Sequence, residues 1–328
     1  MKVAVYYKNS DIRLEERPCP KIKDGELLVK VRASGICGTD LMEWYRVQKG
    51  PRVLGHEMTG EIIESKSPRF KIGQRVFVSH HVPCNSCKFC LEDNHTACET
   101  LHRGNYEPGG YSEFVRVPSS NVANGTYLLP EKMSYEVGTM IEPLACAVRG
   151  QRVIGVKPGQ TVLILGCGIS GLLNIRVAKH LGAKVVATDL HPFRLEKAKE
   201  SGADEVLKGD GPLNLKAERV IVCAGVLGAV KQAFDSVTRK GVVLLFAIPS
   251  VNVEIPTLDF WRNEVTVTSS YGAAPQDLEE SLALLEAGKI DVSDLITHRL
   301  PLEEIQKGFD LASAAGPALK VVLLGPGT

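Results

Sequence analysis

The sequence predicts a two-domain α/β protein, in which a mostly β lobe precedes a doubly wound parallel sheet. Its 328 residues exceed the roughly 100–200 residues of one domain. Short strand-like segments broken by Gly and Pro fill the first 145 or so residues. From about Thr161 onward, apolar runs alternate with amphipathic segments, a pattern typical of a parallel sheet with helices on both faces.

The individual elements follow from these patterns. In the first lobe we expect strands at Glu26–Arg32, Gly60–Glu64 and Arg75–Ser79. In the parallel sheet we expect strands at Thr161–Leu165, Lys184–Thr188, Glu205–Leu207, Arg219–Cys223, Gly241–Ala247 and Glu264–Ser269. Gly182, Pro192 and Gly202 are helix-boundary residues, and they predict helices at Leu172–Leu181 and Phe193–Ser201. A helix at about Gln276–Ala287 and a strand at Leu319–Leu324 complete the chain.

Composition and charge argue against several functional classes. A hydrophobic fraction of 44% and a charged fraction of 23% are close to the average for soluble globular proteins. The net charge is +1 and no long run of Lys and Arg is present, so we expect no nucleic-acid partner. No apolar run approaches the length of a membrane span and the first residues do not resemble a signal peptide, so we expect no membrane partner and a cytoplasmic location.

A glycine fingerprint follows the first strand of the expected parallel sheet. The run Val162–Leu165 leads directly into Gly166-Cys167-Gly168-Ile169-Ser170-Gly171. Glycines at this spacing permit a tight turn and let the backbone approach a pyrophosphate, while the following helix presents its first N–H groups to the anion. We therefore expect a Rossmann dinucleotide site formed by Gly166, Gly168, Ile169, Ser170 and Gly171.

An acidic residue stands at the expected distance from this fingerprint. Asp189 ends the second strand, about 20 residues further on. Its carboxylate would accept hydrogen bonds from the ribose 2′-hydroxyl and repel a 2′-phosphate, so NAD is predicted in preference to NADP. Arg194 also belongs to the expected cofactor site, and its cation could tolerate that phosphate. The alternative is that the glycines only form a turn and Asp189 caps a helix.

Four of the nine cysteines lie close together in the sequence. Cys84, Cys87, Cys90 and Cys98 supply the four thiolates of a closed tetrahedral zinc shell, so we expect a structural zinc site. An iron–sulfur loop is the nearest alternative, but its usual run places three residues before the last Cys and a Pro after it. Here seven residues intervene and Glu99 follows. Chance clustering is the remaining alternative.

A second set of metal-binding residue types is dispersed. Cys37 lies in Cys37-Gly38-Thr39-Asp40, His56 and Glu57 follow Gly55, and Glu142 precedes Pro143-Leu144. Taken singly, each is more often an ordinary residue: a buried thiol, a satisfied polar side chain or a solvated carboxylate.

Taken in order with the quartet and the fingerprint, this series resembles the zinc-containing medium-chain dehydrogenase/reductase family, and it is similar to the sorbitol (polyol) and threonine dehydrogenase branch. The resemblance implies a GroES-like catalytic domain at residues 1–145 and 282–328 and a Rossmann NAD-binding domain at residues 146–281. It also implies two zinc ions per chain.

The resemblance implies roles for individual residues. Cys37 and His56 would bind a catalytic zinc, Glu57 would bind it directly or from close by, and Glu142 would be a ligand or hold the metal-bound water. Thr39 would accept the alcohol proton. Lys320 would contact the cofactor pyrophosphate. Where the family often has a His, this chain has Met42, so the proton relay would end in water or the ribose.

The resemblance implies a function as well. We expect an NAD-dependent zinc alcohol dehydrogenase that transfers hydride between NAD and a secondary alcohol, with a polyol or sugar alcohol as the leading substrate. Threonine and simple alcohols stay open. We expect a homodimer or homotetramer, with Glu264–Ser269 as a candidate contact strand.

Two alternative functions differ from this expectation in the residues or the activity that they require. A zinc-free NADPH reductase of the same superfamily would not need Cys37, His56, Glu57 and Glu142. A non-catalytic sensor that binds zinc and a dinucleotide would show no NAD reduction with any alcohol.

Overall fold

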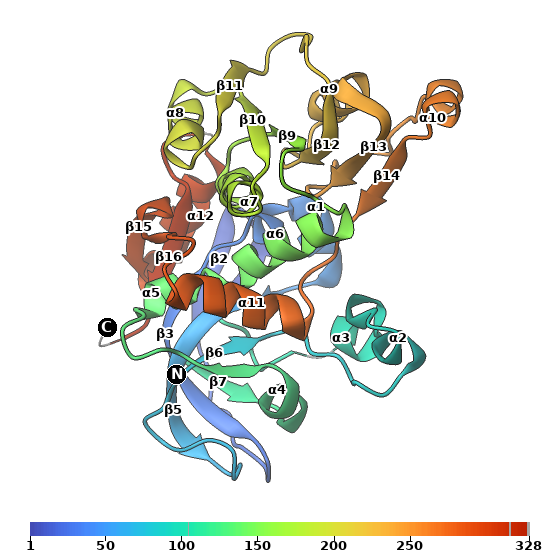
Figure 1. Cartoon of the computed structure of the whole chain (residues 1–328). Helices are drawn as coiled ribbons and strands as arrows, with labels where there is room; N and C mark the ends of the chain where they lie inside the picture. Colours follow the sequence, from blue (N-terminus) through green and yellow to red (C-terminus); the bar gives the residue numbers. More distant parts are fainter. Residues whose placement is uncertain (104, 315, 327–328) are drawn as a thin grey trace. The chain divides into compact units, whose positions relative to one another are not determined.

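Three sheets organise the chain in a computed structural model, which describes residues 1–103, 105–314 and 316–326 (Figure 1). The smallest sheet joins β1 (Lys2–Lys8) to β2 (Asp11–Glu16) and β4 (Arg52–Val53). A seven-stranded sheet contains β15 (Ile296–Pro301), β16 (Lys320–Leu324), β3 (Leu27–Gly35), β5 (Glu57–Ser65), β6 (Arg75–Ser79) and β8 (Thr126–Leu128), and β7 (Phe114–Val117) also pairs with β3. The expected strands of the mostly β lobe are therefore present.

Strand β3 is the centre of the seven-stranded sheet. It pairs antiparallel with β5, with β7 and with β16. Its apolar residues are buried, including Leu27, Val29 and Val31, and they pack in one core with residues of β5, β6 and β7. Because β3 has partners along both edges, its C-terminal end lies beside segments that are distant in the sequence.

Short helices connect the strands of this part of the chain. They are the 3-10 helices η1 (Gly38–Leu41), η2 (Val47–Lys49) and η3 (His95–Ala97) and the helices α1 (Glu43–Arg46), α2 (Lys88–Leu91), α3 (Glu99–Arg103), α4 (Ser119–Asn124) and α5 (Tyr135–Gly138). Two longer helices, α11 (Pro275–Glu286) and α12 (Ile305–Ser313), come from the C-terminal part. Phe309 of α12 packs in a core with Tyr6 and Tyr111, which ties the end of the chain to its beginning.

The third sheet is the predicted doubly wound sheet. Its six strands lie in the order β11-β10-β9-β12-β13-β14, and every neighbouring pair is parallel (Figure 1). The strands are β9 (Thr161–Leu165), β10 (Lys184–Asp189), β11 (Glu205–Lys208), β12 (Ala217–Val222), β13 (Val237–Leu245) and β14 (Thr266–Ser269). Three helices pack against its strands: α7 (Ile169–His180), α8 (Pro192–Glu200) and α9 (Leu227–Ser236). In the sequence, α6 (Ile141–Val153) precedes the sheet and α10 (Thr257–Asn263) lies between β13 and β14.

The chain divides into two units, and the division differs from the predicted boundaries. One unit contains Met1–Pro143, Gly272–Ala287 and Asp291–Thr328, and the other contains Leu144–Tyr271 and Gly288–Ile290. Helix α11, split by the predicted boundary at residue 282, therefore belongs to the first unit. The Ser281 hydroxyl donates to the carbonyl of Ile141 at 2.8 Å, a buried contact that ties α11 to that unit.

No helix within residues 1–103, 105–314 and 316–326 combines the length and apolar character that a membrane crossing requires.

Candidate functional site

The register of β3 brings the dispersed metal-binding residues together. Gly35, the last residue of β3, pairs with Glu57, the first residue of β5. Cys37 lies two residues beyond Gly35 and His56 lies one residue before Glu57. The ligand atoms of Cys37, His56 and Glu57 consequently lie within 4.8 Å of one another. Glu142 is buried in the first turn of α6, in the same unit, but its carboxylate does not belong to this group.

The Glu57 carboxylate is buried, and one of its two oxygens has a polar partner among the described residues. One oxygen forms an ion pair with the ammonium of Lys320, and both side chains are 1% exposed. The other oxygen, Oε1, is buried and has no hydrogen-bond partner among the described residues. A buried carboxylate oxygen without a partner is costly unless a ligand satisfies it. A thiolate, an imidazole and this oxygen form a donor set that suits zinc.

The structure shows contacts of Lys320 that the sequence did not predict. Besides the ion pair with Glu57, its ammonium donates to the carbonyl of Ile36 at 3.2 Å. The predicted contact of Lys320 with a cofactor pyrophosphate stays a prediction. The ion pair depends on Gly35, because a Cβ there would lie 2.2 Å from Glu57 Oε2 and 2.7 Å from Lys320 Cε. Lys320 therefore balances the charge of Glu57.

A buried aspartate orients the histidine of this group. Asp40 is 0% exposed and accepts a hydrogen bond from the Tyr111 hydroxyl at 2.6 Å. Its other oxygen lies 3.0 Å from Arg46 Nη2 and 3.5 Å from His56 Nδ1. Burial opposes ionisation, but the three partners outweigh it and lower the pKa of Asp40 to about 2. With Nδ1 held by a carboxylate, His56 keeps Nε2 for a metal.

Thr39 presents its hydroxyl directly beside the Cys37 sulfur. It lies in the η1 turn, where the Cys37 side chain caps the first turn by accepting from the Thr39 N–H. The Thr39 hydroxyl donates to Cys37 Sγ at 3.3 Å and accepts from Arg46 Nη2 at 3.1 Å. The side chain predicted to handle the substrate proton is therefore at the metal-binding group, on an exposed turn.

Two further histidines adjoin the group. The ring of His80 lies 4.8 Å from that of His56 and 3.6 Å from that of His81, between centroids. Burial is the main cause that lowers the pKa of His81 to about 3, and the positive charges of Arg46 and Lys49 contribute. Both imidazoles are therefore neutral near pH 7, since the pKa of His80 is also well below its usual value because of burial.

Sequence reasoning missed His80, His81, Arg46 and Tyr111. The His-His pair just before the cysteine loop was a visible signal. Arg46 and Tyr111 gave none, because their roles depend on contacts with Asp40 that the sequence does not reveal.

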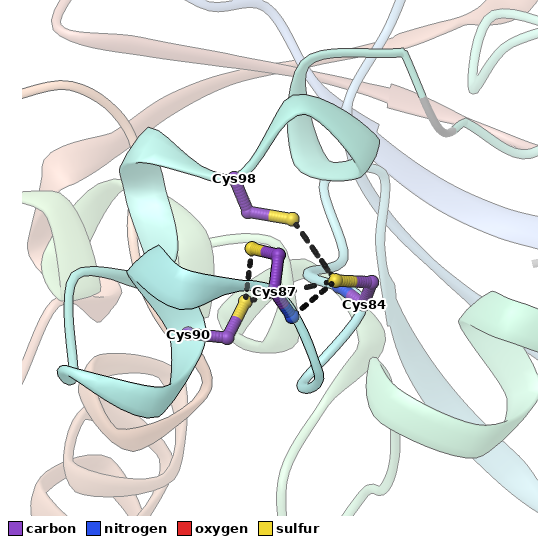
Figure 2. Close-up of side chains that lie close together, drawn as sticks. All are labelled: Cys84, Cys87, Cys90 and Cys98. Carbon is purple, nitrogen blue, oxygen red and sulfur yellow. Dashed lines mark hydrogen bonds between the residues drawn. The ribbon is translucent and has the colours of Figure 1, made fainter.

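The cysteine quartet converges in a loop of the first unit, as Figure 2 shows. The sulfur–sulfur distances are 4.0 Å between Cys84 and Cys90, 3.5 Å between Cys87 and Cys90, and 3.6 Å between Cys98 and Cys84. A tetrahedron with zinc–sulfur bonds of about 2.3 Å has edges of about 3.8 Å, whereas a disulfide would bring two sulfurs to about 2 Å. The observed spacing suits a four-thiolate metal shell.

Backbone N–H groups already point at the sulfurs of this loop. Cys87 N donates to Cys84 Sγ at 3.3 Å, and Cys84 N donates to Cys98 Sγ at 3.4 Å. Hydrogen bonds from Ser86 and then Cys87 lower the pKa of Cys84 to about 5. Burial raises the pKa of Cys90 to about 12. The loop thus favours a thiolate at Cys84, the form that binds metals.

The glycine fingerprint forms the predicted strand-to-helix turn in the second unit. Gly166 follows β9, Gly168 is the N-cap of α7, and Ile169, Ser170 and Gly171 form the first helical turn. A Cβ at Gly171 would lie 1.9 Å from the Gly166 carbonyl oxygen, so only glycine permits this close approach. A Cβ at Gly168 would meet no atom of the described chain within 4 Å. This open space over a helix N-terminus suits a pyrophosphate.

Asp189 is held in place at the end of β10. Its two carboxylate oxygens accept from the N–H groups of Cys167 at 2.8 Å and His191 at 2.9 Å. Each oxygen retains a lone pair, so the carboxylate can accept further hydrogen bonds. Arg194 lies on α8, and its buried Nε has no partner among the described residues. Arg194 is therefore a cation that a phosphate or an adenine could approach.

Two family models match two stretches of the chain. Residues 23–130 match the alcohol dehydrogenase GroES-like domain, and residues 170–287 match the zinc-binding dehydrogenase family. The chain is 32% identical to sorbitol dehydrogenase of Bacillus subtilis, across 95% of this chain and 93% of that protein. It is 33% identical to an alcohol dehydrogenase of Geobacillus stearothermophilus, across 94% of this chain and 95% of that protein.

Solved structures resemble the whole chain as well. A zinc-binding dehydrogenase of Sinorhizobium meliloti bound to NADP has a TM-score of 0.85 at 28% identity, covering 98% of each chain. An Escherichia coli CFT073 protein described as a short chain alcohol dehydrogenase, in complex with NADH, has a TM-score of 0.88 at 28% identity, covering 99% of each chain.

The chain belongs to the zinc-containing medium-chain dehydrogenase/reductase family, the alcohol dehydrogenase superfamily. Its activity class is that of a zinc-dependent oxidoreductase acting on CH–OH groups with a nicotinamide cofactor. The predicted family, fold class and enzyme class are confirmed.

Two of the fingerprint glycines, Gly168 and Gly171, should respond differently to a methyl group. We expect Gly171→Ala to lower the thermal unfolding midpoint by roughly 2–10 °C, because the helix must move away from Gly166. We expect Gly168→Ala to leave the midpoint nearly unchanged while raising the Kd for NAD about tenfold or more, because its methyl group fills the space left for the pyrophosphate. Scanning fluorimetry and titration calorimetry measure the two effects. Equal loss of stability in both variants would contradict this division of roles.

Proposed function

We propose that this chain is an NAD-dependent zinc dehydrogenase that oxidises a secondary alcohol of a polyol or sugar alcohol to a ketone. The observation that carries the proposal is the convergence of Cys37, His56 and Glu57 beside the Thr39 hydroxyl, with Glu57 Oε1 buried and unpartnered among the described residues. The similarity to sorbitol dehydrogenase across nearly the whole chain supports the polyol class. In the overall reaction, hydride leaves the carbinol carbon for NAD and the hydroxyl proton leaves for solvent.

Each residue has a proposed part. Cys37 and His56 hold a catalytic zinc, Glu57 binds it directly or from close by, and buried Glu142 is a further ligand or holds the metal-bound water. When bound, zinc supplies Lewis-acid chemistry that makes a coordinated hydroxyl far more acidic. Thr39 accepts the substrate proton and passes one to water or the cofactor ribose, because Met42 has no titratable group. Cys84, Cys87, Cys90 and Cys98 hold the second zinc and stiffen their loop.

The second unit binds NAD in this proposal. Gly166, Gly168, Ile169, Ser170 and Gly171 receive the pyrophosphate at the start of α7. Asp189 accepts the ribose hydroxyls with its remaining lone pairs, which favours NAD, and Arg194 lies near the same end of β10. We propose that residues 146–281 form the NAD-binding domain.

We also propose a homodimer or homotetramer in the cytoplasm. Strand β14 is an edge strand of the parallel sheet, and large apolar side chains on and before α10 are exposed nearby in the sequence, namely Ile255, Leu258 and Trp261. An unpaired edge strand with apolar neighbours is a natural pairing surface for a second copy.

A substrate screen tests the proposed reaction. NAD reduction is measured with sorbitol and other alditols, simple primary and secondary alcohols, and threonine, and zinc is quantified on the same sample. We expect the highest kcat/KM with an alditol and about two zinc ions per chain.

A simple alcohol as the best substrate would favour the second candidate, an alcohol dehydrogenase, which the similarity to the Geobacillus stearothermophilus enzyme supports. No NAD reduction with any of these compounds would overturn the proposal.

The two zinc sites should be separable by single substitutions. We expect Cys37→Ser to lose one of two zinc ions and nearly all activity while the thermal midpoint changes little. Cys98→Ser should lose the other zinc and lower the midpoint, because the buried Cys98 sulfur belongs to the shell that closes its loop. Metal analysis and scanning fluorimetry measure both. Loss of both ions, or of neither, from either variant would contradict a two-site chain.

Cofactor preference should depend on Asp189. We expect Asp189→Gly to raise the KM for NAD about tenfold or more and to relax discrimination against NADP, because the substitution removes both the ribose acceptor and the negative charge. The ratio of kcat/KM for the two cofactors is the measurement. Equal use of NAD and NADP by the unsubstituted enzyme would contradict the assignment.

A further inference from the structure

A guanidinium contacts the hydroxyl that we propose as the proton acceptor. Arg46 is the last residue of α1, and its Nε donates to the Thr39 carbonyl at 2.9 Å. Its Nη2 donates to Thr39 Oγ1 at 3.1 Å and to Asp40 Oδ1 at 3.0 Å. One side chain thus fixes the backbone and the side chain of Thr39, and it is anchored by a buried carboxylate.

These contacts determine where the Thr39 hydroxyl points. A threonine hydroxyl has one hydrogen and two lone pairs. The hydrogen is directed at Cys37 Sγ and one lone pair accepts from Arg46, so the remaining lone pair is the acceptor left for a substrate. When that lone pair takes a proton from the substrate, the original hydroxyl hydrogen is the one released to water or the ribose. Thr39 lies on an exposed turn, where its side chain would otherwise be free to change rotamer. Arg46 and Cys37 together hold one rotamer.

Arg46 is the charged side chain of this segment that is directed at Thr39. The other charged side chains of α1 and the following turn are engaged elsewhere: Glu43 accepts from the Asn9 N–H, and Lys49 donates to the Tyr45 hydroxyl. Among the described residues, Arg46 is the cation that contacts the Thr39 hydroxyl.

We propose that Arg46 is a positioning residue of this dehydrogenase, which holds the Thr39 hydroxyl in its proton-accepting orientation, while Asp40 keeps Tyr111 and His56 as partners when Arg46 is replaced. The proposal rests on the proposed function for the role of Thr39. The hydrogen bonds that it invokes are properties of the chain itself.

A double-mutant cycle tests this role. Thr39→Val removes the hydroxyl with little change of shape. Arg46→Gln removes the positive charge and the guanidinium N–H groups that donate to Thr39 and Asp40. We expect Arg46→Gln to lower kcat at least about tenfold, the usual effect of losing a charged hydrogen bond, with KM changed less than about threefold. We expect the double variant to be no slower than Thr39→Val alone, because Arg46 has nothing left to position.

Conservative and control variants sharpen the test. Arg46→Lys keeps the charge with a single donor group, so we expect a kcat between those of wild type and Arg46→Gln, and added guanidinium ion should partly restore Arg46→Gln. Arg13→Gln is the matched control, because Arg13 also pairs with a neighbouring aspartate, Asp11, but on β2. It should retain wild-type kcat and KM.

Two readouts do not depend on activity. We expect the zinc content of Arg46→Gln to equal that of wild type, and its crystal structure to show the Thr39 side chain in a different or mixed rotamer. An unchanged Thr39 rotamer, additive losses in the double variant, a rise in KM with constant kcat, or loss of zinc would each overturn the proposal. If the unsubstituted enzyme oxidised no alcohol, the proposed function would fail while the rotamer measurement would still test the positioning by Arg46.

Discussion

The buried carboxylate of Asp40 is the interaction on which the candidate site depends. It is fully enclosed, yet it is ionised, because a hydroxyl, a guanidinium and an imidazole surround it. Removing one partner of such a group leaves a buried charge partly unsatisfied, which typically costs a few kcal/mol. Asp40 therefore couples three segments: the Cys37 turn, the His56 turn and the loop that carries Tyr111. The positions of these three segments therefore depend on one another.

The second determinant is the central position of β3. Its final residue, Gly35, pairs with Glu57 on one side and with Val322 on the other. This register places Lys320 beneath Glu57 and leaves no room for a side chain at residue 35. The Lys320 ammonium forms an ion pair with this buried carboxylate, which lies next to a thiol and an imidazole. A one-residue slip would turn Glu57 to the other face and separate the donor set.

The two cysteine-containing sites have different physical requirements. The quartet needs only a short loop, because its four sulfurs lie within 15 consecutive residues and its N–H groups point at them. Its four sulfurs would complete the zinc shell, so it is suited to stabilise structure and not to bind a substrate. The group of Cys37, His56 and Glu57 offers three donors and leaves room for an exchangeable ligand. Chemistry is therefore expected at the dispersed group, although the quartet is the more conspicuous pattern in the sequence.

The sequence by itself determined every feature that local chain geometry controls. The parallel strands, the glycine fingerprint with Asp189 and the quartet were predictable because their residues are neighbours along the chain or follow a fixed strand–turn–helix path. What tertiary structure decided is the environment of the dispersed residues. The ion pair of Lys320 with Glu57 was not predicted, and Arg46 and Tyr111 carried no signal. The reason is that long-range strand register and burial, not sequence spacing, decide which charged groups meet in the core.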